Sequence, residues 1–300
     1  MEHTADPGPA RPLRRVLRRV LRRVLRREVA RIRDPHRLLA MGILVVIGTL
    51  VCTGLIARGE LAGSDARAYW AAVRIWLNGG DPYRPSGPFL PYVYAPWMLP
   101  LFGPWALLPW DVAWFVWRGG TILVLLWTIH WAYRRRPLAT ALVLLGLSFP
   151  IAANLDTGNI TLPLAFVLWA TRFARPPAAG LLWGLAAWMK WLPVPFWILL
   201  APRARAWGLL WFVVSALLSL ALLPITILQL QALFGFGDRP VRLDYLVLLW
   251  ALLPWLWLSP DPLQWLRAST WRSAAAAWRH DPSRRVRGLL GLTGDIDGGT

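Results

Sequence analysis

Two aspartates lie in one polar stretch of the chain, Gly63–Pro91, between hydrophobic runs that are typical of membrane spans. Asp65 stands at the start of an expected helix, and Asp81 follows in a Gly-Gly-Asp-Pro turn. A carboxylate within reach of a hydroxyl nucleophile can take its proton, which accelerates a transfer reaction by about 10²–10⁴-fold. We therefore interpret Asp65 as a candidate catalytic base, and the alternative is a helix cap without chemistry.

Two cations lie inside apolar runs and are candidates for binding an anionic substrate group. Lys190 is the single lysine of the chain and lies within Ala178–Ala201. An ionisable group at membrane depth is a candidate functional residue, so we interpret Lys190 as a candidate for binding an anionic group. The alternative is a structural lysine that reaches the interface. Arg118, within Val112–Tyr133, is a second candidate, either for a headgroup or for a neighbouring helix.

Metal ligands do not gather anywhere in the sequence. The 4 histidines are scattered, and the carboxylates do not form a ligand set on one element. We therefore expect no required metal and no cofactor. The single cysteine, Cys52, excludes an intramolecular disulfide.

The composition is that of an all-α, polytopic membrane protein. Hydrophobic residues make up 57% of the 300 residues, whereas soluble domains have roughly 45–50%. A net charge of +18 would suggest nucleic-acid binding in a soluble protein. Here the charge is concentrated at the two ends and in short turns, as at cytoplasmic membrane edges. We therefore expect no nucleic-acid partner.

Charge and hydropathy divide the chain into three parts. Residues 1–37 form a basic cytoplasmic arm in which RRVL occurs three times. This arm is either an amphipathic helix on anionic lipid or a low-complexity sequence that keeps its end in the cytoplasm. Residues 38–258 form the membrane domain, with an external loop at 58–91, and residues 259–300 form a basic, partly disordered cytoplasmic tail. We expect a cell-membrane protein with both termini inside and the active site outside.

Six full spans and one or two broken segments are predicted. The six runs are Leu38–Ala57, Val112–Tyr133, Leu138–Asn154, Asn159–Ala174, Trp207–Ile227 and Tyr245–Leu258. Tyr92–Pro109 contains four prolines, which predicts a broken or re-entrant segment. Basic residues flank both ends of Ala178–Ala201, so a hairpin with Lys190 near its tip is favoured over a straight span. Gly180 and Gly184 are spaced for close helix packing.

A helix within the polar stretch is expected to position Asp65. Apolar residues recur at helical spacing over Ala66–Leu77, at Ala68, Ala71, Ala72, Ile75 and Trp76. Ser64 and Asp65 stand at the cap position, and Gly79-Gly80 ends the pattern. Such a helix could lie along the bilayer surface and hold Asp65 at its start.

Three groups of residues occur in a recognisable order. The first is Asp65, Tyr69 and Gly80-Asp81-Pro82-Tyr83; the second is Tyr92-Val93-Tyr94-Ala95-Pro96; the third is Gly158-Asn159-Ile160-Thr161-Leu162, then Ala179–Ala187, Lys190 and Pro193. In this order and spacing the chain resembles glycosyltransferase family 87, the polyprenyl-phosphate-mannose-dependent α-mannosyltransferases with a GT-C fold. The resemblance covers roughly Leu38–Ala201.

The resemblance implies a GT-C-like helical bundle with an external juxtamembrane helix. It implies an inverting transfer of a sugar, with mannose expected, from a polyprenyl-phosphate donor to a lipid or glycan acceptor. Asp65 is then the base. The residues implied in substrate binding, together with the two cations, are Asp81, Tyr83, Tyr94 and Asn159. The family usually has Gly-Gln where this chain has Gly158-Asn159, a shorter amide of the same type.

Two other readings remain open. The family is usually longer, with further spans, so a shortened, non-catalytic relative that binds lipid or helps an assembly is the main alternative. A small transporter is the third. The external position of the polar stretch and the absence of paired sequence halves speak against it.

Overall fold

The computed structural model describes residues 34–58, 62–235 and 243–259. This part is helical, with short 3₁₀ segments, and contains no strand. Four of its helices are apolar and long enough to cross a membrane: α2 (Pro35–Arg58), α5 (Trp110–Arg135), α6 (Pro137–Thr157) and α9 (Pro202–Ala221). The predicted all-α, polytopic membrane class is therefore confirmed. The predicted arm and tail lie outside the described residues, apart from 34–37 and 259.

The prediction of six full spans is wrong for the described part, because the helix within Asn159–Ala174 is too short; four single helices have the length and composition of a span. α7 (Thr161–Thr171) has 11 residues and rises about 16 Å, against a hydrocarbon core of about 30 Å. It is enclosed by protein. The 3₁₀ helix η4 (Leu243–Leu252) continues into α11 (Leu253–Leu258). Since a 3₁₀ helix rises about 2 Å per residue, the two together rise about 29 Å.

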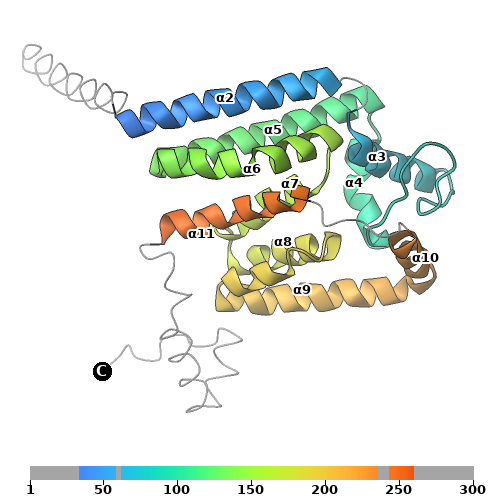
Figure 1. Cartoon of the computed structure of the whole chain (residues 1–300). Helices are drawn as coiled ribbons and strands as arrows, with labels where there is room; N and C mark the ends of the chain where they lie inside the picture. The colour runs from blue at the N-terminus through green and yellow to red at the C-terminus, as the bar shows by residue number, and fades with distance from the viewer. Residues whose placement is uncertain (1–33, 59–61, 236–242, 260–300) are drawn as a thin grey trace, which may run out of the picture.

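The long helices run roughly parallel to one another, and the chain turns back at both ends of the bundle (Figure 1). At one end lie the short helices α3 (Ser64–Leu77), α4 (Leu99–Ala106) and α10 (Leu223–Phe234). We name this the α3 end. The helix ends and turns at the opposite end, the arginine end, carry Arg134, Arg135, Arg136, Arg172, Arg175, Arg203 and Arg205.

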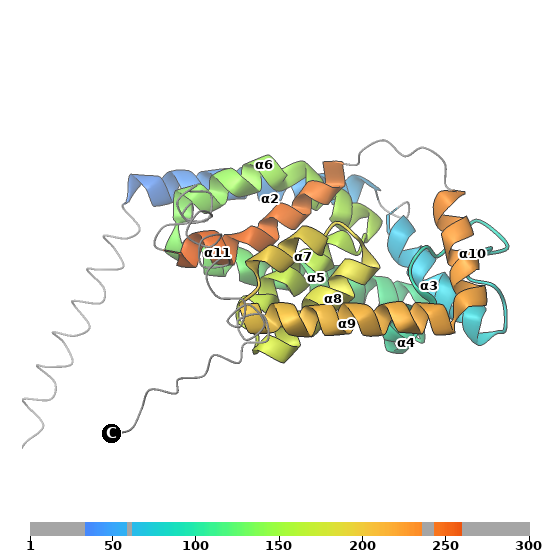
Figure 2. The same ribbon diagram turned by 90° about the horizontal axis from the view of Figure 1, so that it is seen from below.

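The predicted break in Tyr92–Pro109 is confirmed. This segment forms a 3₁₀ turn, η2 (Pro96–Met98), and the eight-residue α4, which has Pro104 inside it. The predicted span Trp207–Ile227 is wrong in its extent. α9 ends at Ala221, and α10 begins with a proline in its first turn. Figure 2 shows α10 standing across the end of α9.

The predicted hairpin over Ala178–Ala201 is confirmed. α8 (Pro176–Met189) ends at Lys190, whose backbone is extended, and the 3₁₀ helix η3 (Val194–Leu199) follows. The indole N–H of Trp183 donates to the carbonyl of Pro193 at 3.1 Å, so the chain doubles back on α8. The turn brings Lys190 to the α3 end.

Close packing of α8 on α9 requires the predicted small residues. A Cβ on Gly180 would lie 2.5 Å from the backbone nitrogen of Gly208, and one on Gly184 would lie 3.2 Å from the Cβ of Trp211. These contacts advance together along both helices, so α8 and α9 run parallel. The prediction that Gly180 and Gly184 serve helix packing is confirmed.

α3 confirms the predicted helix but not its cap. The N-cap is Gly63, with φ 85°, and no side chain caps the helix, so the cap role expected for Asp65 is wrong. The C-terminal end is as predicted: the N–H groups of Gly79 and Gly80 donate to the carbonyls of Trp76 and Ile75, a Schellman motif. The buried face includes the four alanines at 66, 68, 71 and 72. Trp76 was expected on this face but is 43% exposed.

Candidate active site

The first turn of α3 is docked on the junction between α6 and α7. The N–H of Gly63 donates to the carbonyl of Asp156 at 2.7 Å. Gly158, with φ 69°, lies against the helix, because a Cβ there would come within 2.6 Å of the Cβ of Ala66. It would also lie 2.8 Å from the ring of Trp114. Only glycine fits this position, and the close approach places Asn159 beside Asp65.

Asn159 joins the predicted base to the predicted cation. Its Nδ2 donates to Oδ2 of Asp65 at 2.6 Å, and its Oδ1 accepts from Nζ of Lys190 at 2.9 Å. Because a lysine ammonium can only donate, the amide oxygen must face Lys190 and the amide NH₂ must face Asp65. Asn159 is only 4% exposed, so its orientation is held by the surrounding protein. We name these residues the Asp65–Asn159–Lys190 cluster.

Thr161 and Tyr245 also contact Lys190. The Thr161 hydroxyl accepts from Nζ of Lys190 at 2.7 Å and donates to Oδ1 of Asn159 at 2.6 Å. The ring of Tyr245 lies under the ammonium, 4.6 Å from Nζ to the ring centroid. Lys190 is half-buried, and these contacts stabilise its charge where the hairpin turns.

The two charges of the cluster do not form an ion pair with each other. The amide of Asn159 stands between them. A direct bond to Lys190 would occupy the carboxylate that a base needs. Here Oδ2 of Asp65 is held by Asn159, and no hydrogen bond from the described residues reaches Oδ1. Asp65 is half-buried, so Oδ1 is suited to accept a proton from an incoming hydroxyl.

Arg118 lies close to the start of α3 but is not bonded to the cluster within the described residues. Its guanidinium stacks over the ring of Trp114, with Cζ 5.2 Å from the centroid. Trp114 in turn packs on Gly63 and Gly158, beside Asp65. The role of Arg118 in donor binding remains a prediction.

Asp81, Tyr83 and Tyr94 lie in the segment between α3 and η2, apart from the Asp65–Asn159–Lys190 cluster. Oδ1 of Asp81 accepts from the backbone N–H of Tyr83 at 2.8 Å, which is a local turn contact. The Tyr83 hydroxyl donates to the carbonyl of Tyr94 at 3.0 Å, and both tyrosines are buried. The structure thus gives these residues a supporting position, and their predicted contact with substrate remains a prediction.

Tyr69 connects Tyr94 to the segment that carries Asn159, and it was not predicted as a site residue. Its hydroxyl lies 3.1 Å from the hydroxyl of Tyr94 and accepts from the N–H of Ile160 at 3.4 Å. Burial raises the pKa of Tyr69 well above its usual value, and the nearby Tyr94 and Asp65 raise it further. The hydroxyl therefore stays neutral. The available signal was its position four residues after Asp65, on the same helix face.

Thr161 and Tyr245 were also missed as site residues. Thr161 follows Asn159 by two positions, a spacing at which asparagine side chains commonly bond the local backbone. The N–H of Thr161 indeed donates to Oδ1 of Asn159 at 2.9 Å. For Tyr245 the sequence has no local signal, because its contact with Lys190 joins two distant segments.

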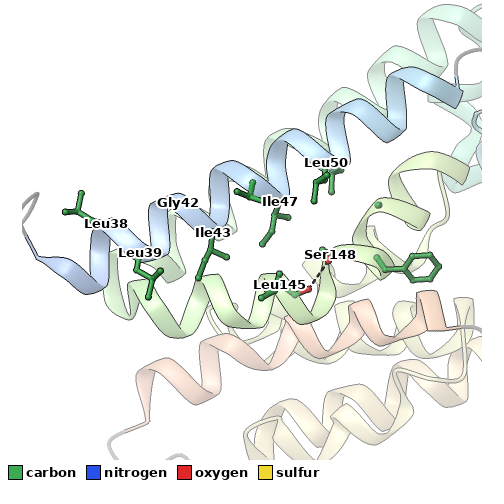
Figure 3. A pocket seen from close by; sticks show the side chains of 12 residues that line it. Leu38, Leu39, Gly42, Ile43, Ile47, Leu50, Leu145 and Ser148 are labelled. Carbon is green, nitrogen blue, oxygen red and sulfur yellow. Dashed lines mark hydrogen bonds between the residues drawn. The ribbon is translucent and has the colours of Figure 1, made fainter.

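An apolar groove lies between α2 and α6 (Figure 3), and its side chains are not suited to catalysis. This groove has a volume of about 660 Å³ and is lined mainly by leucine, isoleucine and valine side chains. The Ser148 hydroxyl in it is already bonded to the carbonyl of Leu145 at 2.8 Å. None of its lining residues is ionisable, so we place the candidate active site at the cluster and not in this groove.

Three or more potential metal ligands do not lie together anywhere in the described part of the chain. The expectation that no metal is required remains a prediction.

A family model described as glycosyltransferase family 87 matches residues 92–242, which is half of the chain. The matched segment contains Tyr94, Arg118, Asn159 and Lys190, whereas Asp65, Asp81 and Tyr83 precede it. Neither the curated proteins nor the solved structures include a match to this chain.

Proposed function

Because this chain belongs to glycosyltransferase family 87 and is a membrane glycosyltransferase, we propose that it transfers a sugar from a polyprenyl-phosphate donor to a lipid or glycan acceptor. We propose mannose as the sugar and a single displacement that inverts the anomeric centre. The observation that carries the proposal is the Asn159 amide, which holds Asp65 and Lys190 in one cluster.

Lys190 is the residue proposed to bind the donor phosphate. As the bond between the anomeric carbon and the phosphate oxygen breaks, negative charge develops on the polyprenyl phosphate. A preorganised cation in a poorly hydrated site stabilises that charge, and removal of one such donor typically costs about 10²–10³-fold in rate. The phosphate leaves as an anion, so the reaction needs no second carboxylate as an acid.

Asp65 is the residue proposed to act as base. Its Oδ1 takes the proton of the acceptor hydroxyl while the hydroxyl oxygen bonds to the anomeric carbon. The proton ends on Asp65, and the electron pair of the broken bond leaves with the phosphate. A single displacement forms no covalent glycosyl-enzyme intermediate, unlike the double displacement of retaining glycosidases.

The distribution of charge supports a site on the outer face of the cell membrane. The helix ends and turns at the arginine end carry seven arginines, whereas the described aspartates other than Asp34 lie at the α3 end. Cytoplasmic loops are enriched in arginine and lysine. We therefore propose that the arginine end and both termini are cytoplasmic, with anionic lipid as the partner of the basic arm.

The direct test is a transfer assay with the full-length protein in proteoliposomes. Labelled polyprenyl-phosphate mannose is the donor, and extracted membrane lipids and glycolipids are the acceptors. We expect labelled product whose new linkage is inverted relative to the donor, as read by NMR. The Asp65→Asn variant should lose about 10²–10⁴-fold in rate. Asp111→Asn, an exposed carboxylate in the first turn of α5, is the matched control and should keep its rate.

Two outcomes would overturn parts of the proposal. Absence of transfer from polyprenyl-phosphate mannose, glucose and arabinose alike would reject the donor class. It would favour the non-catalytic alternative if the protein still binds polyprenyl phosphate. A retained linkage would reject the single displacement.

A further inference from the structure

Three hydrogen bonds converge on the amide oxygen of Asn159. Two come from one residue: the backbone N–H of Thr161 donates to Oδ1 at 2.9 Å, and the Thr161 hydroxyl donates to it at 2.6 Å. The third comes from Nζ of Lys190 at 2.9 Å. Because all three groups are donors, they face the oxygen of the amide, and its NH₂ is left to face Asp65.

The direction of the Thr161 hydroxyl proton is set by Lys190. Nζ of Lys190 lies 2.7 Å from this hydroxyl oxygen, and an ammonium can only donate. The hydroxyl therefore accepts from Lys190 and gives its own proton to Asn159. Thr161 is fully buried, so bulk water does not compete for that proton. The hydroxyl thus joins the cation to the amide by a second route, beside the direct bond between Lys190 and Asn159.

The opposite orientation of the Asn159 amide would break the cluster. Its NH₂ would then face the ammonium of Lys190, donor against donor, and its oxygen would face the carboxylate of Asp65. Once both of these bonds are lost, the favourable contact is a direct pair between Asp65 and Lys190, because opposite charges attract strongly at a half-buried site. Such a pair would occupy both groups that the proposed reaction uses.

We propose that Thr161 is a positioning residue, which fixes the amide of Asn159 and thereby keeps Asp65 and Lys190 connected but not paired. The inference rests on the proposed function and concerns how its site is held. Thr161 is the first residue of α7, so its N–H has no partner inside the helix and is available to Asn159. Serine has the same hydroxyl and can replace threonine here. Valine has the same shape without the hydroxyl and cannot.

The single lysine of the chain gives a readout of this arrangement that needs no turnover. Full-length protein that carries ¹⁵N-lysine, in nanodiscs, gives one lysine side-chain signal in solid-state NMR, that of Lys190. Thr161→Val should shift this signal, and Thr161→Ser should leave it at the wild-type position. Thr171→Val is the matched control, because the Thr171 hydroxyl is buried in the same helix and donates to the carbonyl of Leu168 at 2.6 Å. An unshifted signal in Thr161→Val would overturn the inference.

A double-mutant comparison separates the loss of one hydrogen bond from the loss of the amide's orientation. Asp65→Asn is added to the wild type and to Thr161→Val, and the Lys190 signal is recorded in each. If Asp65 and Lys190 pair directly once Thr161 is changed, Asp65→Asn should shift the signal more in the Thr161→Val background than in the wild type. Equal shifts in the two backgrounds would contradict the positioning role.

A kinetic measurement separates this inference from the proposed function. With polyprenyl-phosphate mannose as donor, Thr161→Val should lower kcat about tenfold, the size expected for one hydrogen bond within a charged cluster. Thr161→Ser should restore the wild-type kcat, and an equal loss in both variants would overturn the inference. If the Lys190 signal shifts as expected but the wild type transfers no sugar, the positioning role stands and the proposed function fails. If the wild type transfers sugar and the signal does not shift, the proposed function stands and the positioning role fails.

Discussion

Asp65 and Asp81 stand in the same polar stretch, and their surroundings differ in a way that separates a reactive carboxylate from a structural one. The Asp81 carboxylate accepts from the N–H of Tyr83, two residues along its own loop. The Asp65 carboxylate accepts from the side chain of Asn159, and three helices separate these two residues in the sequence. Asn159 in turn accepts a hydrogen bond from Lys190. A carboxylate connected to a distant cation can act on a substrate that the cation holds, whereas a carboxylate that closes its own turn shapes a loop.

The largest expected effect is the difference between Asp65→Asn and Asp81→Asn. The first removes the proposed base, so transfer should fall by about 10²–10⁴-fold. The second weakens one turn contact of about 1 kcal/mol, so transfer should fall by less than about tenfold. Initial rates in the same proteoliposome preparation give the comparison. Equal losses of rate in the two variants would contradict the assignment of Asp65, and not Asp81, as the base.

Lys190→Gln should lower the transfer rate by about 10²-fold, since it removes the cation proposed to face the developing charge. Arg84→Gln removes a cation at the same end of the molecule, where its guanidinium donates to Oε1 of Gln231, and should have little effect. Binding of polyprenyl phosphate, measured alongside, should weaken in Lys190→Gln alone. If the Lys190→Gln variant transferred sugar at the full rate, Lys190 would not be the residue that binds the donor phosphate.

Gly158→Ala tests whether the docking of α3 places Asp65. The new Cβ would lie 2.6 Å from the Cβ of Ala66, at a φ of 69°. Overpacking and strain together should lower the free energy of unfolding by about 2–4 kcal/mol. Gly146→Ala, in α6 with open space around it, is the control and should be neutral or slightly stabilising. Thermal unfolding in detergent measures both variants, and similar midpoints would contradict the close approach.

The smallest expected effect is that of Arg58→Gln. The Arg58 side chain is 56% exposed and pairs with Asp156 at 3.1 Å, so its loss should cost no more than about 1 kcal/mol. The backbone bond from Gly63 to Asp156 would remain. Transfer at the wild-type rate in this variant would show that the backbone and Gly158 hold α3. A loss as large as that of Gly158→Ala would assign the docking to the ion pair.

Much of the fold could be predicted because it depends on local properties of the chain. Hydrophobic length located α2, α5 and α6 to within a few residues, and the two glycines at 79 and 80 marked the end of α3. The hairpin at Lys190 followed from basic residues at both of its ends. The extent of α9 and the short α7 could not be predicted in this way, since apolar composition does not distinguish a lipid-facing helix from one enclosed by protein.

The residues of the site could be predicted from the sequence, but the hydrogen bonds between them could not. The resemblance supplied Asp65, Asn159 and Lys190 together. It did not indicate that the amide of Asn159 would bridge the other two, because that depends on the close approach of Gly158 to Ala66. Tyr69 and Tyr245 make contacts with residues far away in the sequence. Such contacts are set by packing between segments, which no local pattern records.

The most direct test of the central claim is an experimental structure of the full-length protein with a non-transferable polyprenyl-phosphonate mannose. We expect a phosphonate oxygen to lie within about 3 Å of Nζ of Lys190. We also expect Oδ1 of Asp65 to face the anomeric carbon from the opposite side. A phosphonate bound away from Lys190, or on the same side of the sugar as Asp65, would contradict it.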